Sequence, residues 1–178
     1  MEIWDAYYKN GLKAGLDLVR DEAIPDGLYH LVCEIIVKHI DGTYLIMQRD
    51  FKKKGWPGKY EATAGGSALK GETPIQGAIR ELREETGIVT TELKQIYQTV
   101  SEWQHSIYYG FLCFTDCEKN SITLQEGETI SYQWLNTKEL LEIVDSEKYI
   151  DTYRERQEVF LKTIRESIEV KVDKSSNV

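Results

Sequence analysis

Apolar and polar residues alternate along most of the chain, and two different periods divide it into strands and helices. The segments with the β-branched and aromatic content typical of strands are Ile3–Tyr8, Leu16–Val19, Leu31–Ile40, Tyr44–Arg49, Lys59–Ala64, Leu93–Ser101, Ser106–Thr115 and Ile130–Leu135. Helices are expected over Thr73–Gly87, Thr137–Val144 and Glu147–Glu169. Strands on both sides of one central helix, with further helices at the end, predict an α/β fold in which helices cover a mixed sheet.

Turn residues indicate how the first strands are joined. Asn10-Gly11 lies between the first two strands and is a strong hairpin signal, and Asp41-Gly42 joins the next pair in the same way. Pro25-Asp26-Gly27 separates the first hairpin from the third strand. We therefore expect an N-terminal β-hairpin that precedes the main body of the fold.

The central helix has clear start and stop signals. Thr73 is suited to cap its N-terminus, Pro74 to occupy its first turn, and Gln76 to complete a capping box with Thr73. Gly87 is placed to end the helix. The apolar stripe expected to face the core consists of Ile75, Ala78, Ile79 and Leu82.

Three glutamates of this helix, Glu81, Glu84 and Glu85, fall in one sector of its surface, away from the expected apolar stripe. Like charges at these spacings destabilise a helix by about 0.2–0.5 kcal/mol per pair, and Arg80 offsets only part of the repulsion. A hard divalent cation with oxygen ligands would neutralise such a face. Spacing alone leaves a second interpretation open, which is a solvated acidic surface with incidental Arg pairs.

The residues around this helix resemble the Nudix box. Residues 65–88 read GGSALKGETPIQGAIRELREETGI, and the defined positions of that signature are occupied by Gly66, Glu72, Arg80-Glu81-Leu82, Glu84-Glu85 and Gly87-Ile88. The flanks are similar as well, with a Trp56-Pro57-Gly58 loop before the box and Trp134-Leu135 followed by a helix after it. The resemblance covers about residues 29–145 and implies a Nudix-type α/β/α sandwich with a mixed β-sheet, an N-terminal β-hairpin and a C-terminal helix.

The resemblance also divides the chain. We expect a single domain over residues 1–170, made of a hairpin extension (1–28), a Nudix core (29–145) and a C-terminal helix (146–170). Residues 171–178 are expected to form a flexible tail.

The Nudix resemblance implies roles for the box residues. Its metal ligands would be Glu81, Glu84, Glu85 and the carbonyl of Gly66, with Mg²⁺ as the cofactor and Mn²⁺ as a substitute. Arg80 and Glu72 would orient these carboxylates. Glu81, Glu84 and Arg80 would be catalytic, in the hydrolysis of the diphosphate linkage of a nucleoside diphosphate joined to another group. Bound Mg²⁺ would neutralise diphosphate oxygens and lower the pKa of a water molecule.

Several residues outside the box are weaker candidates. Glu128, near Glu126 in an acidic segment, is either a metal ligand or general base or part of a surface turn. Arg49 ends a strand, where it either binds substrate phosphate or lies on the surface. Glu34, within an apolar strand, is either buried and paired or points into a substrate cleft. Trp103, together with Tyr108 and Tyr109, offers a face on which a base could stack, or fills the core. The three lysines at 52–54 are expected to form a solvated loop.

Two other kinds of function are compatible with the box. The run from Trp56 to Gly66 resembles the branch of Nudix proteins close to isopentenyl-diphosphate isomerases. Those isomerases use a cysteine, and the corresponding stretch here, Glu61-Ala62-Thr63-Ala64, has no thiol. A non-catalytic, nucleotide-binding regulatory module is the other alternative, although such modules usually lack box carboxylates, and all of them are present here.

Composition limits the partners. With 22 Lys and Arg against 30 Asp and Glu, the formal net charge is −8, which argues against general binding to nucleic acid. The longest apolar stretch is too short for a membrane span, and the N-terminal residues lack the pattern of a secretory signal. Three cysteines do not make a disulfide framework, so a cytoplasmic location is expected. A small-molecule diphosphate is the expected partner, and a homodimer is possible.

Overall fold

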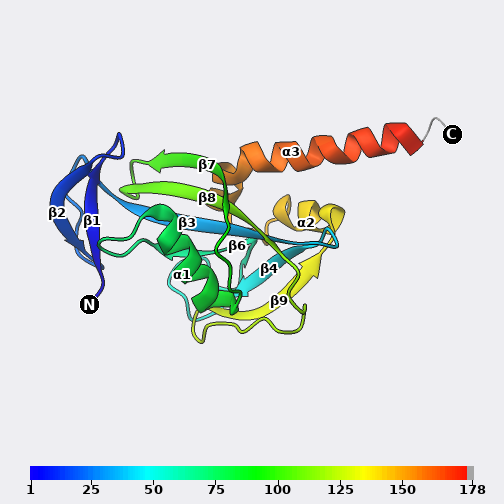
Figure 1. Ribbon diagram of the computed structural model, residues 1–178, viewed down its shortest axis with the longest axis horizontal. Helices are drawn as coiled ribbons and strands as arrows, with labels where there is room; N and C mark the ends of the chain where they lie inside the picture. Colours follow the sequence, from blue (N-terminus) through cyan, green and yellow to red (C-terminus); the bar gives the residue numbers. More distant parts are fainter. Residues whose placement is uncertain (176–178) are drawn as a thin grey trace.

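The computed structural model describes the backbone of residues 1–175 and the side chains of residues 1–168. Its strands are β1 (Ile3–Tyr8), β2 (Lys13–Val19), β3 (Leu28–His39), β4 (Tyr44–Arg49), β5 (Tyr60–Glu61), β6 (Thr63–Ser67), β7 (Lys94–Ser101), β8 (Ser106–Thr115) and β9 (Thr129–Leu135). Its helices are α1 (Pro74–Thr86), α2 (Thr137–Val144) and α3 (Asp151–Ser175). Figure 1 shows β3 as the long strand that crosses the molecule.

β3 is the centre of a mixed sheet. β8 runs parallel to it from His30 to His39, and β6 runs antiparallel to it along residues 32–36. β1 pairs with the start of β3, and β4 pairs near its end through Lys38 and Tyr44. β3 and β4 then diverge, because β6 pairs with β3 while β5 pairs with β4. This divergence opens the sheet beside α1. Since β3 has both parallel and antiparallel partners, the predicted mixed sheet is confirmed.

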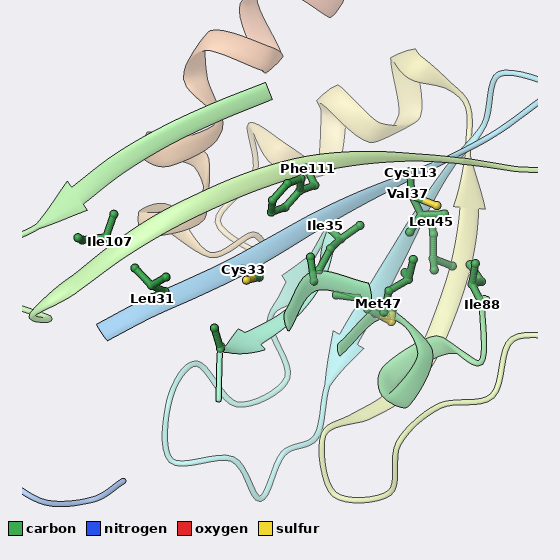
Figure 2. Packing of buried hydrophobic residues seen from close by; sticks show 14 of the residues in the cluster. Leu31, Cys33, Ile35, Val37, Leu45, Met47, Ile88, Ile107, Phe111 and Cys113 are labelled. Atoms are coloured by element: carbon green, nitrogen blue, oxygen red, sulfur yellow. The ribbon is translucent and has the colours of Figure 1, made fainter. Parts of the chain in front are cut away.

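Helices cover both faces of the sheet, so the predicted α/β/α sandwich is confirmed (Figure 1). Alternate residues of β3 point to opposite faces. The residues of β3 in the core cluster that includes α1 are Tyr29, Leu31, Cys33, Ile35 and Val37. Figure 2 shows the last four of them. Ile36 points the other way and packs with α2 and α3 through Leu140 and Leu161.

α1 begins and ends where the sequence predicts. The Thr73 side chain accepts a hydrogen bond from the backbone N–H of Gln76, and the Gln76 side chain completes the capping box. Gly87 ends the helix in the left-handed conformation with φ 76°, which glycine adopts without steric cost.

The buried face of α1 differs from the predicted apolar stripe. Gly77, Ala78, Leu82 and Thr86 are buried, whereas Ile75 is 39% exposed. Gly77 explains the difference, because a Cβ added there would lie only 3.1 Å from the Cβ of Ala68. The helix therefore approaches the sheet on its glycine side. As a result, Glu81 and Glu85 border the buried stripe instead of lying away from it.

The N-terminal hairpin is confirmed. Gly11 has a φ of 81° in the turn between β1 and β2, and β2 begins at Lys13, three residues before the predicted start. Its small core consists of Trp4, Ala6, Leu18 and Leu28. The hairpin is joined to the sheet through the pairing of β1 with β3.

Other segments also extend beyond their predicted bounds, among them β3, which begins at Leu28 instead of Leu31. The strand expected over Lys59–Ala64 is divided into β5 and β6, and β6 continues through Gly65 and Gly66 to Ser67. α3 begins at Asp151 and continues past Glu169 to Ser175, since no glycine or proline interrupts it. Residues 171–175, expected in a flexible tail, are therefore helical, while 176–178 lie outside the described residues.

Candidate active site

A cleft of about 930 Å³ lies beside the C-terminal half of α1. Its walls come from β3, β6, α1, α3, the loop before β9 and the N-terminal hairpin. The sequence-predicted site residues that line it are Glu34, Arg49, Gly66, Arg80, Glu81, Glu84, Glu85 and Glu128. The fold thus brings into one cleft residues that are up to 94 positions apart (from 34 to 128).

Arg80 organises the carboxylates at the α1 end of the cleft. Its Nε and Nη2 donate to the two oxygens of Glu72 at 2.9 and 3.0 Å. Its Nη1 donates to Glu81 at 2.7 Å and to Glu84 at 3.1 Å. Nη2 also donates to the backbone carbonyl of Ser67 at 3.0 Å, which attaches the guanidinium to the end of β6. One side chain therefore fixes the positions of three carboxylates.

Glu72 completes this arrangement from the loop before α1. Its Oε2 accepts the backbone N–H of Leu69 at 2.8 Å, so both of its oxygens are held. Burial raises the pKa of Glu72, but the hydrogen bonds from Arg80 and Leu69 outweigh burial, and the net shift is downward. Glu72 therefore stays ionised and holds the guanidinium of Arg80 in place. Its expected role in orienting the metal ligands stays a prediction.

Glu81 lies against Gly66. Its side chain is only 13% exposed, and a Cβ added to Gly66 would lie 2.6 Å from its Oε1. Any other residue at position 66 would therefore displace the carboxylate. Burial raises the pKa of Glu81, and the bond from Arg80 opposes that rise.

Glu84 and Glu85 differ in exposure. The Glu84 side chain is 48% exposed and points to solvent at the mouth of the cleft, whereas Glu85 is largely enclosed. Within the described residues, the only hydrogen bond to the Glu85 carboxylate comes from the backbone N–H of Gly65 at 2.9 Å. Burial, followed by the nearby Glu61 charge, raises the pKa of Glu85 well above its ordinary value. Negative charge is thus in surplus in this part of the cleft.

The carboxylate oxygens are the ligand type that a hard divalent cation prefers, but they do not converge on one point in the present arrangement. Among the described residues, no three His, Cys, Asp or Glu side chains converge closely enough to hold a metal ion. Arg80 draws Glu81 and Glu84 to its guanidinium, and Glu85 bonds to Gly65 instead. The donors are nevertheless all oxygens, and the carboxylates here outnumber the guanidinium that neutralises them. Ions of this class take such ligands and would relieve the charge surplus.

Arg49 lines the cleft but is already paired. Its Nη1 donates to both oxygens of Glu61, at 3.2 and 3.0 Å, and its Nε donates to the carbonyl of Gly55. Burial raises the pKa of Glu61 to about 7, against the opposing effect of Arg49. The Arg49 side chain is only 14% exposed, so the surface alternative is wrong. Arg49 lines the cleft while it pairs with a buried acid, and its binding of substrate phosphate stays a prediction.

Glu128 also lines the cleft, in an ion pair with Lys53. The Lys53 side chain is 23% exposed and Glu128 is 31% exposed, so the pair is partly solvated. Lys53 therefore departs from the expected solvated loop and becomes a cation of the cleft wall. Glu126 is not among the cleft-lining residues.

The last two predicted residues have different outcomes. Glu34 is buried and paired, with Arg156 Nε at 3.0 Å and with the Tyr97 hydroxyl at 2.6 Å, and it also lines the cleft. Trp103 is not brought to the cleft: it is 72% exposed in the turn between β7 and β8. In that turn it is Gln104 that lines the cleft.

Of the two tyrosines proposed with Trp103, Tyr108 lines the cleft, whereas Tyr109 packs against the core. Several cleft residues were missed from the sequence, chiefly Glu61, Tyr153 and Arg156, with Glu2 and Arg20 from the N-terminal hairpin. Arg156 had a detectable signal. It stands within the buried stripe of α3, beside Gln157 and Phe160, where a charge requires a buried partner. Glu34, a buried acid in an apolar strand, is its partner. The two residues are 122 positions apart, so only the fold shows that they pair.

Comparisons with known proteins agree with the fold and the site. Residues 29–155 match the family model described as NUDIX domain. An uncharacterised Nudix hydrolase of Listeria monocytogenes is 32% identical over 154 residues, which cover 84% of this chain and 89% of that protein. An isopentenyl-diphosphate Delta-isomerase of Salmonella heidelberg is 29% identical over 114 residues, or 61% of this chain and 63% of that protein.

A solved structure shows the same fold. The crystal structure of DR0079 from Deinococcus radiodurans superposes with a TM-score of 0.70 and covers 89% of this chain and 99% of that one, at 18% identity. Within residues 1–175, no helix combines the length and the apolar character that crossing a membrane requires. The family match over most of the chain and the Listeria relative are decisive: this chain belongs to the NUDIX domain family and is a Nudix pyrophosphohydrolase by enzyme class.

Proposed function

We propose that this protein is a Mg²⁺-dependent hydrolase of the diphosphate linkage in a nucleoside diphosphate joined to another group. The observation that carries the proposal is the surplus of carboxylates around Arg80, in a cleft of about 930 Å³. That volume is in the range of ligand sites for molecules of this size. Mn²⁺ has the same preference for oxygen ligands and is proposed as a substitute.

The proposed ligands are the carboxylates of Glu81, Glu84 and Glu85 and the carbonyl of Gly66. Mg²⁺ held there would supply neutralisation of diphosphate oxygens and a water of lowered pKa. Arg80, fixed by Glu72, would keep Glu81 and Glu84 at the cleft.

Charged side chains from other parts of the cleft lining complete the proposed chemistry. Lys53 and Arg49 line the cleft and would donate to phosphate oxygens as charge develops on them. Glu128, beside Lys53, is the proposed general base, and would accept a proton from the attacking water. The substrate is proposed to be a small molecule, not nucleic acid. A cytoplasmic location and a homodimer stay predictions.

The isomerase alternative has the likeness to the Salmonella isomerase in its favour, but the chain has no thiol suited to it. Cys33 lines the cleft, yet its Sγ donates to the carbonyl of Pro74 at 3.0 Å. Burial raises the pKa of Cys33 to about 12, so its reactive thiolate form is scarce at neutral pH. Hydrolysis therefore has the better support.

The experiment is a substrate panel followed by phosphorus NMR with Mg²⁺, with Mn²⁺ and with a chelator. The panel contains nucleotide sugars, dinucleoside polyphosphates, a nucleoside diphosphate-ribose and isopentenyl diphosphate. We expect two phosphate-monoester products from at least one nucleotide substrate, with Mg²⁺ or Mn²⁺ and not with the chelator. Isomerised isopentenyl diphosphate would contradict the proposal, and so would nucleotide binding without any cleavage across the panel.

A further inference from the structure

The cleft extends beyond the carboxylates to a second group of side chains that the Nudix box does not include. This group, the aromatic end of the cleft, consists of Trp56, Gln104, Tyr108, Tyr153 and Arg156. Its members come from the loop before β5, the turn before β8, β8 and α3. Gly65 lies between the two ends, since its N–H bonds to Glu85 while it pairs with Glu34 across the sheet. The two ends are thus neighbours in a single cleft.

The guanidinium of Arg156 is fixed between two aromatic rings. Its central carbon lies 4.0 Å from the ring centroid of Tyr108 and 4.6 Å from that of Tyr153. Its Nε donates to Glu34 Oε1 and Oε2 at 3.0 and 3.1 Å, and its Nη2 donates to Oε1. Both side chains are nearly buried, at 9% exposure for Arg156 and 4% for Glu34. Arg156 therefore holds one orientation, and Glu34 balances its charge.

One donor group of Arg156 is left over. Within the described residues its Nη1 makes no hydrogen bond, and it is not among the buried polar atoms that lack a partner, so it keeps access to solvent on a side chain that lines the cleft. Gln104 has a similar surplus. Its Oε1 accepts the Tyr108 hydroxyl at 2.8 Å, which leaves its Nε2 without a hydrogen bond to any described residue. The aromatic end therefore presents two sets of N–H donors beside aromatic rings.

Trp56 adds a third ring in an unusual backbone conformation. Its ring centroid lies 6.4 Å from that of Tyr153, and its φ is 49°, which is rare for a bulky residue. Such conformations persist only where the surroundings hold them, and they are concentrated at ligand sites.

N–H donors beside aromatic rings are complementary to a planar ring that carries hydrogen-bond acceptors. We propose that the aromatic end binds the nucleobase of the substrate, with Arg156 Nη1 and Gln104 Nε2 donating to acceptor atoms of the base and Trp56 contacting its face. A phosphate is a poorer match, because Glu34 already balances the charge of Arg156. The inference rests on the proposed function, since the same cleft would place the diphosphate at the carboxylates.

The test is calorimetric binding with ligands that cannot undergo the proposed hydrolysis. Nucleoside 5′-monophosphates are compared with ribose 5-phosphate, which lacks the base, in buffer with Mg²⁺. We expect at least one nucleotide to bind about 10-fold more tightly than ribose 5-phosphate, because base stacking contributes this much in other proteins. Equal affinities, or no binding of any nucleotide at millimolar concentrations, would overturn the inference.

Two variants locate the contact. Gln104→Leu keeps the side-chain size and removes the donor, and we expect it to weaken nucleotide binding about 3- to 10-fold, as for one hydrogen bond. Trp56→Leu should weaken it about 10-fold. Neither should change the affinity for ribose 5-phosphate, which a general disturbance of the fold would change. Gln98→Leu, at an exposed position of β7 outside the cleft, is the matched control and should bind like the wild type.

The outcomes separate this inference from the proposed function. Nucleotide binding that depends on Gln104, without diphosphate cleavage in the panel, would sustain the base site and refute the proposed hydrolysis of nucleoside diphosphate derivatives. Cleavage that is indifferent to Gln104→Leu and Trp56→Leu, with a sugar or isoprenoid diphosphate cleaved as well as a nucleotide, would sustain the hydrolase and refute the base site.

Discussion

Two arginines organise the two ends of the cleft, and their surroundings differ in charge balance. Arg80, 23% exposed, is shared by Glu72, Glu81 and Glu84. Arg156, 9% exposed, has one carboxylate partner, Glu34, which also accepts the Tyr97 hydroxyl. The first cluster has a surplus of negative charge and is suited to a cation. The second is balanced and enclosed by rings, so it is suited to an uncharged planar group.

The difference also predicts what each cluster does for the protein. A buried ion pair contributes little net stability, but the loss of one partner leaves an uncompensated charge. A partly solvated cluster tolerates such a loss, because water screens the remaining charge. Substitutions at Arg80 and its partners should therefore lower the activity with little loss of stability. Substitutions at Arg156 should lower the stability as well.

The largest effect is expected for Glu84→Gln. The substitution keeps the size of the side chain and removes one proposed cation ligand, so the rate of diphosphate cleavage should fall by about 10³-fold, on the order of 4 kcal/mol of transition-state stabilisation. Because Glu84 is 48% exposed, the free energy of unfolding should change little. Initial rates and urea unfolding measure the two quantities.

Glu92→Gln is the matched control for this variant, since Glu92 is exposed and lies outside the cleft. It should retain the wild-type rate. A Glu84→Gln enzyme with wild-type activity would mean that the carboxylates of α1 form only a solvated surface.

A stability effect of similar size is expected for Arg156→Met. The substitution leaves the Glu34 carboxyl without its cationic partner in a nearly buried position, which should lower the free energy of unfolding by about 3–5 kcal/mol. The double variant Glu34→Leu with Arg156→Met removes both charges and should recover most of the loss. Urea unfolding followed by circular dichroism measures both. A double variant that is no more stable than Arg156→Met would show that the pair is not the source of the effect.

Arg80→Lys tests the other arginine with a smaller expected effect. Lysine keeps the charge but cannot hold Glu72, Glu81 and Glu84 with one planar group. The rate should fall about 10- to 100-fold, as for other residues that orient metal ligands, with little change in the urea midpoint. A stability loss as large as that of Arg156→Met would contradict the distinction between the two clusters.

The smallest expected effect is that of Thr73→Ala, which removes the N-cap of α1. Its side chain accepts the Gln76 N–H at 3.4 Å, and the loss of such a cap costs about 1 kcal/mol of stability. The activity of the folded protein should be retained, because the cap lies at the far end of α1 from Glu84. A rate defect as large as that of Arg80→Lys would show that the cap also positions the carboxylates.

The Arg80 cluster was largely predictable because its information is local. Its residues lie within one loop and one helix, where helical spacing places Glu81, Glu84 and Glu85 on one sector and the caps fix both ends. The apolar stripe predicted for α1 was wrong at Ile75, which is exposed. The spacing of apolar residues does not reveal that Ala68 lies close against Gly77. A glycine gives no apolar signal, although it decided which face of the helix is buried.

The aromatic end was less predictable because long-range packing creates it. The sequence could not decide whether Glu34 is buried and paired or points into a cleft. Its partner, Arg156, is 122 positions away on a helix that carries no motif. Trp103 was chosen for its size, but position within the β7–β8 turn decides which side chain reaches the cleft. Of the aromatic candidates the structure places Tyr108 in the cleft, and it adds Gln104, which the sequence did not indicate.

The most direct test of the central claim is oxygen-isotope labelling with a nucleotide substrate identified in the panel. The reaction is run in ¹⁸O-enriched water with Mg²⁺ or with a chelator, and the products are examined by mass spectrometry. We predict one ¹⁸O atom in one of the two phosphate-monoester products with Mg²⁺, and no product with the chelator. Cleavage that is unchanged by the chelator, or a product without the label, would contradict a carboxylate-held cation that supports attack by water on the diphosphate.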